Sequence, residues 1–182
     1  MKKIICFILL IGLSQPLLAA DFTLHSPDIA DNQLMSAEQE YNGFGCTGDN
    51  ISPRLNWTNA PANTKSFAVT LFDPDAPTGS GWWHWQVVNI PASVNGLKKD
   101  AGNPAKKTAP AGSLQIQNDF GAQGFGGPCP PAGSRAHHYE FTVYALSVDH
   151  LNVKADSSNA LVGYMIKANA LASAKITALY QR

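Results

Sequence analysis

Three segments of the chain alternate hydrophobic and polar positions with the period of two that is typical of β-strands. They cover residues 66–73, 83–90 and 137–143. In the first segment, the residues that share one face end on Asp73, and the third segment starts on His137. Two predicted strands therefore present ionisable side chains at their ends. The middle segment predicts one face with Trp83, Trp85 and Val87, and an opposite face with His84, Gln86 and Val88.

Turn-forming residues surround these strands and predict a mainly β domain. Pro, Gly, Asn and Ser recur at short intervals through most of the chain, as in domains built from many short strands. Residues 95–112 hold several Lys, Gly and Pro and are predicted to form an exposed loop. Ser157 or Ser158 can cap one helix near the C-terminus, and residues 176–180 alternate as a short closing strand. The apolar stripe predicted to pack this helix on the core comprises Leu161, Met165, Ala168 and Ala172.

The first twenty residues have the order of a secretory signal peptide. Two lysines precede the apolar run of residues 4–13, and small residues stand before Asp21. The run is about half as long as a bilayer crossing requires, so a retained membrane anchor is the weaker alternative. We predict a cleavable signal peptide over residues 1–20, a single domain over residues 21–182, and a periplasmic or secreted location.

Removal of the signal peptide changes the charge and the cysteine content. The full chain has 13 basic and 13 acidic residues, and without the two N-terminal lysines 11 basic residues face 13 acidic ones, a net charge of −2. This charge gives no electrostatic support for nucleic-acid binding. Cys46 and Cys129 are the cysteines that remain. Because disulfides persist outside the cytoplasm, we predict that they pair, with two buried thiols as the alternative.

The first cluster of candidate site residues is the run Asp-Pro-Asp-Ala-Pro at residues 73–77, followed by His84. Its two prolines stiffen the chain where it leaves a predicted strand, so both carboxylates are held in fixed directions. That arrangement suits a binding site. The alternative is that Asp73 and Asp75 accept hydrogen bonds from turn amides.

The second cluster precedes the third predicted strand and continues into it. Residues 124–131 are Gly-Phe-Gly-Gly-Pro-Cys-Pro-Pro, and His137 and Tyr139 follow on one face of the strand. Gly126 and Gly127 allow backbone amides to approach a ligand closely, and the prolines fix the path of the chain. A turn whose glycines only satisfy unusual dihedral angles is the alternative. The histidine and the tyrosine on one face favour the wall of a cleft.

In this order, the two clusters resemble the phosphatidylethanolamine-binding proteins, and within them the bacterial Raf-kinase-inhibitor-like branch. The resemblance extends from about Phe22 to Tyr180. Residues 50–53 (Asn-Ile-Ser-Pro) with Trp57, and residues 118–121 (Asn-Asp-Phe-Gly), are also similar to this branch. The resemblance implies a mainly β, compact, β-sandwich-like fold with a C-terminal helix and other peripheral helical segments.

The resemblance also implies a small pocket for phosphate-type or other anionic head groups. Protonated imidazoles and a phenol can donate hydrogen bonds to a phosphoryl oxygen, and a nearby carboxylate raises the pKa of a histidine, so anion affinity is expected to rise below neutral pH. The chain departs from the family at His138, where arginine is usual, and this side chain is predicted to point away from the pocket. The implied ligand-binding residues are Asp73, Asp75 as a buttress, His84, Gly127, Pro128 and Pro130 in the wall, His137 and Tyr139.

The expected function is that of an exported binding or regulatory protein. Such a protein would capture a small anionic or phosphorylated ligand, or dock or inhibit a protein partner outside the cytoplasm, as kinase or protease inhibitors do. The alternative is a hydrolase in which Asp73 or Asp75 and His84 or His137 act as general acid and base. We expect no enzyme activity, because no serine lies in a nucleophile-elbow pattern. No metal site is expected, since the spacings match no zinc signature. No cofactor, nucleic-acid partner or membrane span is expected either.

Overall fold

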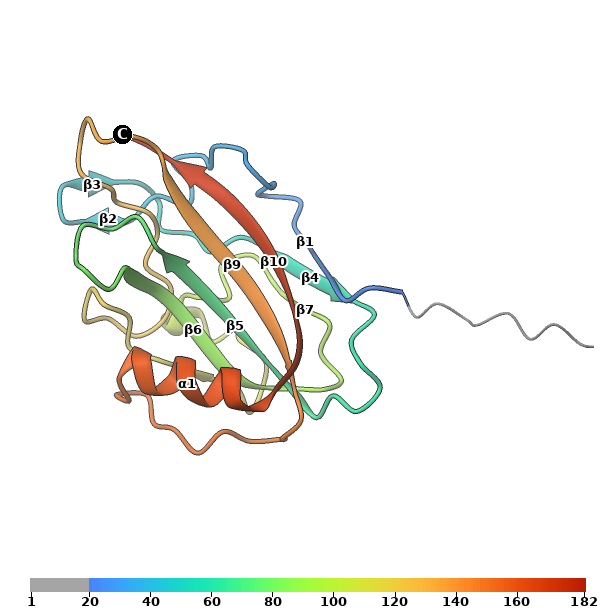
Figure 1. Ribbon diagram of the computed structural model, residues 1–182. Helices are drawn as coiled ribbons and strands as arrows, with labels where there is room; N and C mark the ends of the chain where they lie inside the picture. The colour runs from blue at the N-terminus through green and yellow to red at the C-terminus, as the bar shows by residue number, and fades with distance from the viewer. Residues whose placement is uncertain (1–19) are drawn as a thin grey trace, which may run out of the picture.

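A five-stranded antiparallel sheet forms the centre of the molecule (Figure 1). The computed structural model describes residues 20–182, and the strand order of this sheet is β10-β9-β5-β6-β8. Three of the strands contain the three alternating segments of the sequence, so these predicted strands are present. The strands are β5 (Ser66–Asp73), β6 (Trp82–Pro91), β8 (Leu114–Gln115), β9 (His137–Leu146) and β10 (Ala170–Tyr180).

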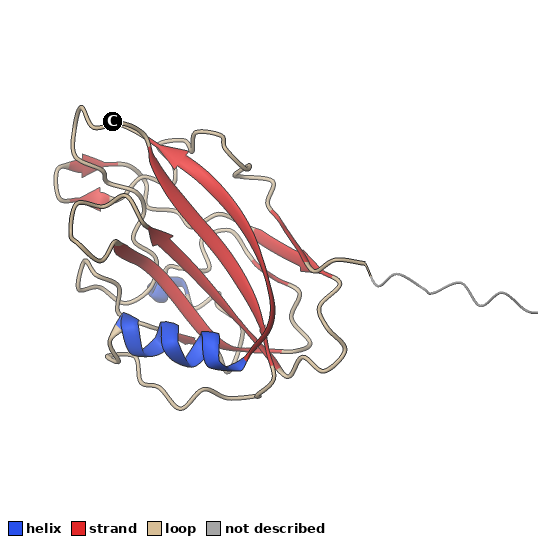
Figure 2. Ribbon diagram, viewed as in Figure 1, coloured by secondary structure: helices blue, strands red, loops and turns tan. Residues whose placement is uncertain are grey.

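A smaller sheet and a helix cover the two faces of the central sheet (Figure 2). Trp57 of the small sheet shares one hydrophobic core with Val69 of β5, and Ile166 of the helix shares a second core with Ala68. This layering confirms the mainly β fold with a helix near the C-terminus. A short 3₁₀ turn, η1, spans Pro104–Lys106. The small sheet contains β1 (Thr23–His25), β4 (Leu55–Thr58) and β7 (Gly96–Leu97), and helix α1 spans Asn159–Asn169.

Helix α1 packs on the sheet with a different face from the one predicted. Ser158 caps the helix, and its hydroxyl accepts a hydrogen bond from the Leu161 amide at 3.3 Å. The buried face carries Val162, Gly163 and Ile166, whereas the Leu161 side chain is 48% exposed. The predicted core stripe is therefore wrong for Leu161 and Ala168, which are exposed, while Met165 packs partly against the core. Gly163 faces the Trp83 ring, and Val162 and Ile166 fill the contact with the sheet.

The helix also ends earlier than predicted, and the chain passes directly into β10. Ala172, which the sequence pattern placed on the helix, pairs with Ala145 of β9. β10 is 11 residues long and not a short closing strand. It runs beside β9 along its length (Figure 1), and this pairing satisfies the backbone polar groups of both strands.

Residues 95–112 form an exposed loop only in part. Leu97 pairs with Leu55 across β7 and β4, and its side chain is buried. Ala101 is also buried in the core. This segment closes one edge of the small sheet, so Leu97 and Ala101 are covered, whereas Ala105 and Ala111 are exposed.

The predicted signal peptide falls almost entirely on residues 1–19, which lie outside the described residues. Helix α1 has 11 residues. Within residues 20–182 no helix has the length and hydrophobicity of a membrane span.

Candidate functional site

A pocket of about 370 Å³ lies where β5 ends and where β6 and β9 begin. These ends meet because β5 is antiparallel to both of its neighbours. The volume is within the range of small-molecule sites. The strands contribute four of the polar lining residues: Asp73 of β5, His84 of β6, and His137 and Tyr139 of β9. The other lining residues are Phe44, Ala76, Pro77, Thr78, Trp82, Phe120, Cys129, Pro130, Pro131 and Arg182.

A β-bulge in β6 positions His84. Leu71 pairs with Trp85 and the next residue of β5, Phe72, pairs with Trp83, so His84 is the extra residue of the bulge. Beyond the bulge the Trp83 ring packs beside Phe72, with centroids 4.5 Å apart, while Trp85 is completely buried in the core. The prediction that Trp83 and Trp85 share a face is therefore wrong, because the extra residue interrupts the period of two.

Asp73 and His137 form a buried pair at the base of the pocket. Nδ1 of His137 lies 2.8 Å from Oδ2 of Asp73, and the other carboxylate oxygen accepts a hydrogen bond from the Asp75 amide at 2.8 Å. A carboxylate only accepts, so Nδ1 of His137 carries the proton. The pair therefore leaves Nε2 as the His137 ring nitrogen available to a ligand.

The backbone of the glycine-rich segment holds the His84 ring. Its Nδ1 lies 2.8 Å from the Gly126 carbonyl oxygen and 3.1 Å from that of Gly127. The ring also meets Tyr139 edge to face, with centroids 5.2 Å apart. Burial lowers the pKa of His84 and outweighs the opposing effects of the carbonyls and of Asp73. The geometry thus favours a neutral imidazole in a fixed orientation.

Two further polar groups of the pocket lack partners. The Tyr139 side chain is completely buried, and its hydroxyl has no hydrogen-bond partner within residues 20–182. Burial, then the negative charge of Asp73 and the approach of the hydroxyl to that carboxylate, raise the pKa of this phenol well above its usual range, so it stays protonated at all ordinary pH values. The indole nitrogen of Trp82 is also buried, and it has no hydrogen-bond partner among residues 20–182.

Aromatic rings form one side of the pocket. Phe120 stacks on Tyr41 with centroids 4.0 Å apart, and Phe44 and Trp82 meet its ring at 5.3 and 5.1 Å. Phe44 is 71% exposed although it lines the pocket. We call Phe44, Trp82 and Phe120 the aromatic rim.

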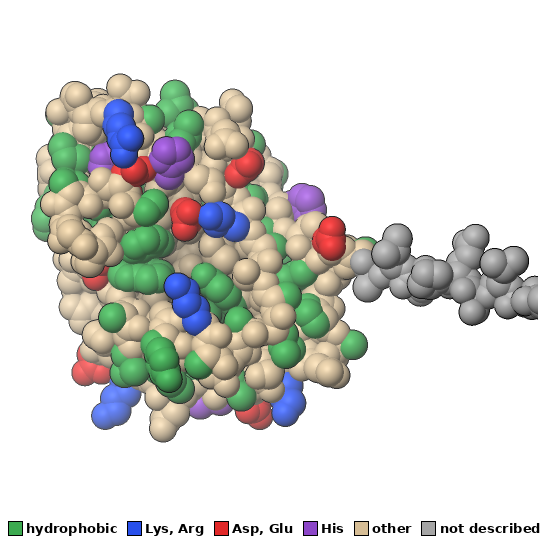
Figure 3. All heavy atoms as spheres, viewed as in Figure 1, with side chains coloured by type: hydrophobic (Ala, Val, Ile, Leu, Met, Phe, Trp, Pro, Cys, Tyr) green, Lys and Arg blue, Asp and Glu red, His purple; other side chains and the backbone are tan. Residues whose placement is uncertain are grey.

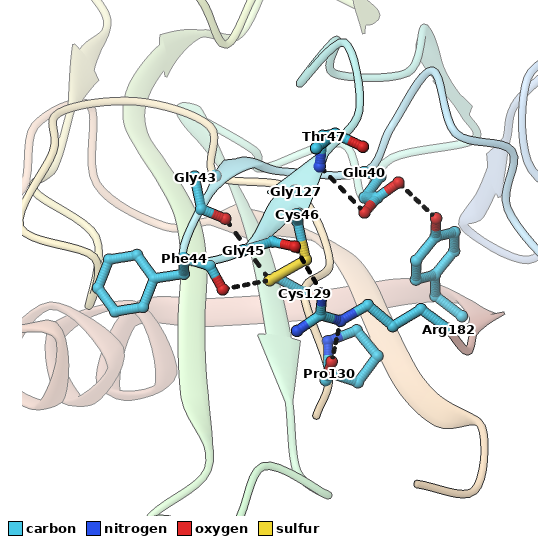
Figure 4. The surroundings of a disulfide bond; sticks show 12 residues. Glu40, Gly43, Phe44, Gly45, Cys46, Thr47, Gly127, Cys129, Pro130 and Arg182 are labelled. Atoms are coloured by element: carbon cyan, nitrogen blue, oxygen red, sulfur yellow. Dashed lines mark hydrogen bonds between the residues drawn. A yellow bond between two sulfur atoms is a disulfide. The ribbon is translucent and has the colours of Figure 1, made fainter. Parts of the chain in front are cut away.

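A disulfide holds part of this rim in place (Figure 4). Phe44 lies at the tip of the hairpin formed by β2 (Asn42–Gly43) and β3 (Cys46–Thr47). The bond between Cys46 and Cys129 joins this hairpin to the pocket wall, which confirms the predicted pairing. The Arg182 side chain adds a second connection, because its Nε and Nη1 donate to the carbonyl oxygens of Pro130 and Gly45, each at 2.7 Å.

Asp75 lies outside the pocket lining and organises the surface beside it. Its carboxylate lies 2.8 Å from Nη2 of Arg135 and 2.6 Å from Nδ1 of His138. Partial burial works against ionisation, but the hydrogen bonds and charge of His138 and the charge of Arg135 lower the pKa of Asp75. Figure 3 shows basic, acidic and histidine side chains grouped at this end of the molecule. His138 thus bonds Asp75 and points away from the pocket.

Gly127 and Pro128 also lie behind the lining, whereas Pro130 belongs to it. A Cβ on Gly127 would come within 1.8 Å of the Gln39 carbonyl oxygen, so only glycine fits there. Its amide donates to the Asn50 side chain at 2.7 Å. The Pro128 carbonyl accepts the Tyr41 amide at 3.0 Å. Both residues therefore shape the wall from outside the lining.

Phe44 and Arg182 line the pocket but had no functional interpretation from the sequence. Each paired strand beside Phe44 has only two residues, which is too short for a periodic signal. Arg182 lies outside both motif clusters. The only sequence signal that pointed to the hairpin was the predicted pairing of Cys46 with Cys129. Phe120 lies in the segment 118–121, which was noted only as part of the family resemblance.

The described lining combines hydrogen-bond donors, acceptors and apolar surface. Within residues 20–182 no three His, Cys, Asp or Glu side chains are grouped so as to hold a metal ion. The polar groups lie at the base of the pocket, and the aromatic rim and the prolines supply apolar surface. Such a pocket can orient a small polar group and cover an attached apolar one.

The sequence profile described as phosphatidylethanolamine-binding protein matches residues 25–181. The chain belongs to the phosphatidylethanolamine-binding protein family. Its fold agrees with this membership: the crystal structure of Escherichia coli YbcL superposes with a TM-score of 0.88 at 52% identity, covering 90% of this chain and 99% of that one.

Two curated relatives extend the comparison within the phosphatidylethanolamine-binding protein family. The UPF0098 protein YbcL of Escherichia coli strain K12 is 49% identical over 100% of this chain and 99% of its own length. The putative lipoprotein LppC of Mycobacterium tuberculosis is 38% identical over 71% of this chain and 58% of its own length. The first similarity spans both motif clusters and the whole described domain.

Proposed function

We propose that this protein binds a small anionic ligand of the phosphate type in the pocket. The observation that carries the proposal is the Tyr139 hydroxyl, which is buried in the pocket lining without a hydrogen-bond partner in the described chain. Leaving such a group unpaired costs about 1–3 kcal/mol, and an anionic oxygen would accept its hydrogen bond. The Trp82 indole N–H is a second buried donor without a partner among residues 20–182.

Arg182 supports the same function through its charge. It is the one lysine or arginine among the pocket-lining residues in the described part of the chain. An arginine has five N–H donors, and the carbonyls of Pro130 and Gly45 use two of them. The guanidinium is therefore fixed in place while it still has donors for an anion.

The apolar part of the pocket favours an anion that carries an organic group. An inorganic ion would occupy only the polar base around Tyr139. The aromatic rim and Pro130 would remain in contact with water, and covering such surface is favourable by about 25 cal/mol per Å². A phosphoryl head group attached to a larger molecule uses both parts.

The protein is proposed to act outside the cytoplasm, in the periplasm or after secretion. The order of residues 1–20 matches a signal peptide, and the bond between Cys46 and Cys129 is of a kind that persists in oxidising compartments. One relative carries the name of a putative lipoprotein. There the pocket would capture a head group or dock and inhibit a protein partner, which would meet the exposed Phe44 first.

Binding without turnover is the function that the pocket supports better. Cys129 is held in the disulfide, and the Thr78 hydroxyl donates to the Gly81 carbonyl at 2.5 Å, so neither is poised as a nucleophile. Both oxygens of Asp73 already accept hydrogen bonds from the protein. The hydrolase alternative could draw on the Asp73–His137 pair for acid–base chemistry, but neither Thr78 nor Cys129 is free to serve as its nucleophile.

Calorimetric titration of the purified protein with phenyl phosphate at about pH 6 tests the proposal, since much of this ester is then a monoanion. Binding is expected, and Tyr139→Phe should weaken it about tenfold by removing one donor. Tyr144→Phe is the matched control, because Tyr144 lies on the same strand outside the pocket lining. Absence of binding to the unmodified protein would contradict the proposal.

A further inference from the structure

The proton on His84 is placed by the backbone. Nδ1 faces the carbonyl oxygens of Gly126 and Gly127, and a carbonyl can only accept a hydrogen bond. Nδ1 therefore carries a hydrogen in every protonation state of the ring. In the neutral imidazole the other nitrogen, Nε2, is then an acceptor. No hydrogen-bond partner for Nε2 occurs among residues 20–182, and His84 lines the pocket.

A second acceptor, the Asp73 carboxylate, lies in the same lining. Each carboxylate oxygen has two lone-pair positions, and the Asp75 amide and His137 occupy one on each oxygen. The Tyr139 hydroxyl approaches the same carboxylate. The base of the pocket therefore pairs donors, such as the Tyr139 hydroxyl, with acceptors. A ligand that only accepts hydrogen bonds would leave the acceptors facing its negative charge.

The permanent charges of the lining point the same way. Arg182 contributes one positive charge and Asp73 one negative charge, which His137 offsets when it is protonated. The pocket thus offers at most one net positive charge while His84 is neutral. A singly charged anion matches this balance better than a doubly charged one.

We propose that this pocket selects anions that bring a proton of their own, with a phosphate monoester monoanion as the type, over anions such as sulfate esters that have none. The proposal rests on the proposed anion-binding function and specifies which anions the site accepts. The ligand P–OH would donate to Nε2 of His84 or to Asp73, while its remaining oxygens accept from Tyr139 and Arg182. No proton transfer to the protein is needed.

The groups around His84 determine the pH range in which this selection holds. The carboxylates of Asp73 and Asp119 favour the imidazolium, His137 and Arg182 face the same cavity, and the Tyr139 phenol stays neutral. Burial prevails over the two carboxylates and lowers the pKa of His84. The ring therefore remains an acceptor into mildly acidic solution.

Phenyl phosphate and phenyl sulfate provide a matched pair of ligands. At about pH 5 both are mostly monoanions of nearly the same shape, because the second pKa of a phosphate monoester is about 6, and only the phosphate has a hydrogen to donate. Calorimetric titration should give about tenfold or greater preference for phenyl phosphate at this pH. At about pH 8, where phenyl phosphate has lost its proton, the preference should largely disappear.

Titration in two buffers of different ionisation enthalpy measures the protons exchanged on binding. Phenyl phosphate at about pH 5 should bind without net proton uptake, because it already carries the proton. Phenyl sulfate can engage His84 as a donor only after protonation of Nε2, so its binding should take up a proton. Tyr139→Phe should weaken both ligands and leave their ratio unchanged, because it removes a donor and no acceptor.

Equal affinity for the two esters at about pH 5, or tighter binding of phenyl phosphate at about pH 8, would overturn the selection while leaving an anion pocket in place. Failure of both esters to bind would reject the proposed function together with the selection. A His84→Phe variant that folds should lose most of the preference for phenyl phosphate over phenyl sulfate. If the variant keeps the full preference, His84 is not the acceptor of the ligand proton.

Discussion

Nδ1 of His137 and Oδ2 of Asp73 lie 2.8 Å apart, and the two side chains are only 5% and 3% exposed. The residues are separated by 64 positions in the sequence. Their contact joins the end of β5 to the start of β9 directly beneath the pocket. Because a buried polar pair is costly to break, it fixes the spacing of these strand ends.

Replacing Asp73 by Asn should lower the free energy of unfolding by about 1–3 kcal/mol. Asparagine has no charge and only one acceptor oxygen. Its NH₂ group cannot accept a hydrogen bond, so either His137 or the Asp75 amide loses its partner. Urea unfolding measures the loss. Asp149→Asn, at an exposed position just beyond β9, should change the value by less than about 0.5 kcal/mol, and a loss that small for Asp73→Asn would contradict the role of the pair.

Removing the disulfide should lower both stability and affinity. Cys46 and Cys129 are 83 residues apart, and opening a loop of that length costs about 4.5 kcal/mol in the chain-entropy model. Cys46→Ser with Cys129→Ser should lose most of that stability in denaturant unfolding. It should also bind phenyl phosphate more weakly, because Phe44 would no longer be held at the rim. Alkylation of both thiols in the unmodified protein without reduction would refute the disulfide.

Arg182→Gln should weaken anion binding about tenfold and reduce its dependence on salt, because a charge-assisted hydrogen bond is lost. Arg182→Lys retains the charge but not the planar fork that bonds Pro130 and Gly45, so it should recover only part of the affinity. Lys154→Gln, an exposed position outside the pocket lining, is the control. Identical affinities for all three variants would exclude Arg182 from ligand binding.

The acid stability of the protein should depend on Asp75. Its folded pKa is lowered mainly by His138, so its contribution to stability is present above the unfolded pKa near 4 and is lost as the pH falls through the folded value. Asp75→Asn should therefore flatten the decline in unfolding free energy below about pH 4. Unfolding measured across this range tests the effect. An unchanged slope in the variant would show that other carboxylates cause the decline.

The sequence predicted the central strands because their residues alternate and because polar groups mark their ends. Asp73, His137 and Tyr139 could be placed together from strand alternation and motif resemblance. Motif resemblance also placed His84 in the pocket, but strand alternation put it on the wrong face, since one extra residue in β6 cannot be recognised from hydrophobicity. In β5, alternation did not distinguish a buried face from an exposed one, because the small sheet and α1 bury both faces.

The parts that escaped prediction depend on contacts distant in sequence. Ala172 has the composition of a helix residue, but its pairing with β9 decides its conformation. Arg182 reaches the pocket only because β10 ends beside the hairpin that the disulfide secures. No local pattern encodes either relationship, and both follow from the order of strands in the sheet.

The bulge at His84 divides β6 into a short part at the pocket and a longer part in the core. From Trp85 onward the side chains of β6 are buried in the core, where a change of residue type alters packing. His84 at the bulge and Trp82 before it line the cavity. Substitution of Trp82 or His84 can alter which ligands the cavity binds without changing the buried residues that hold the sheet together. The same scaffold can thus diversify its ligands by variation at a few positions.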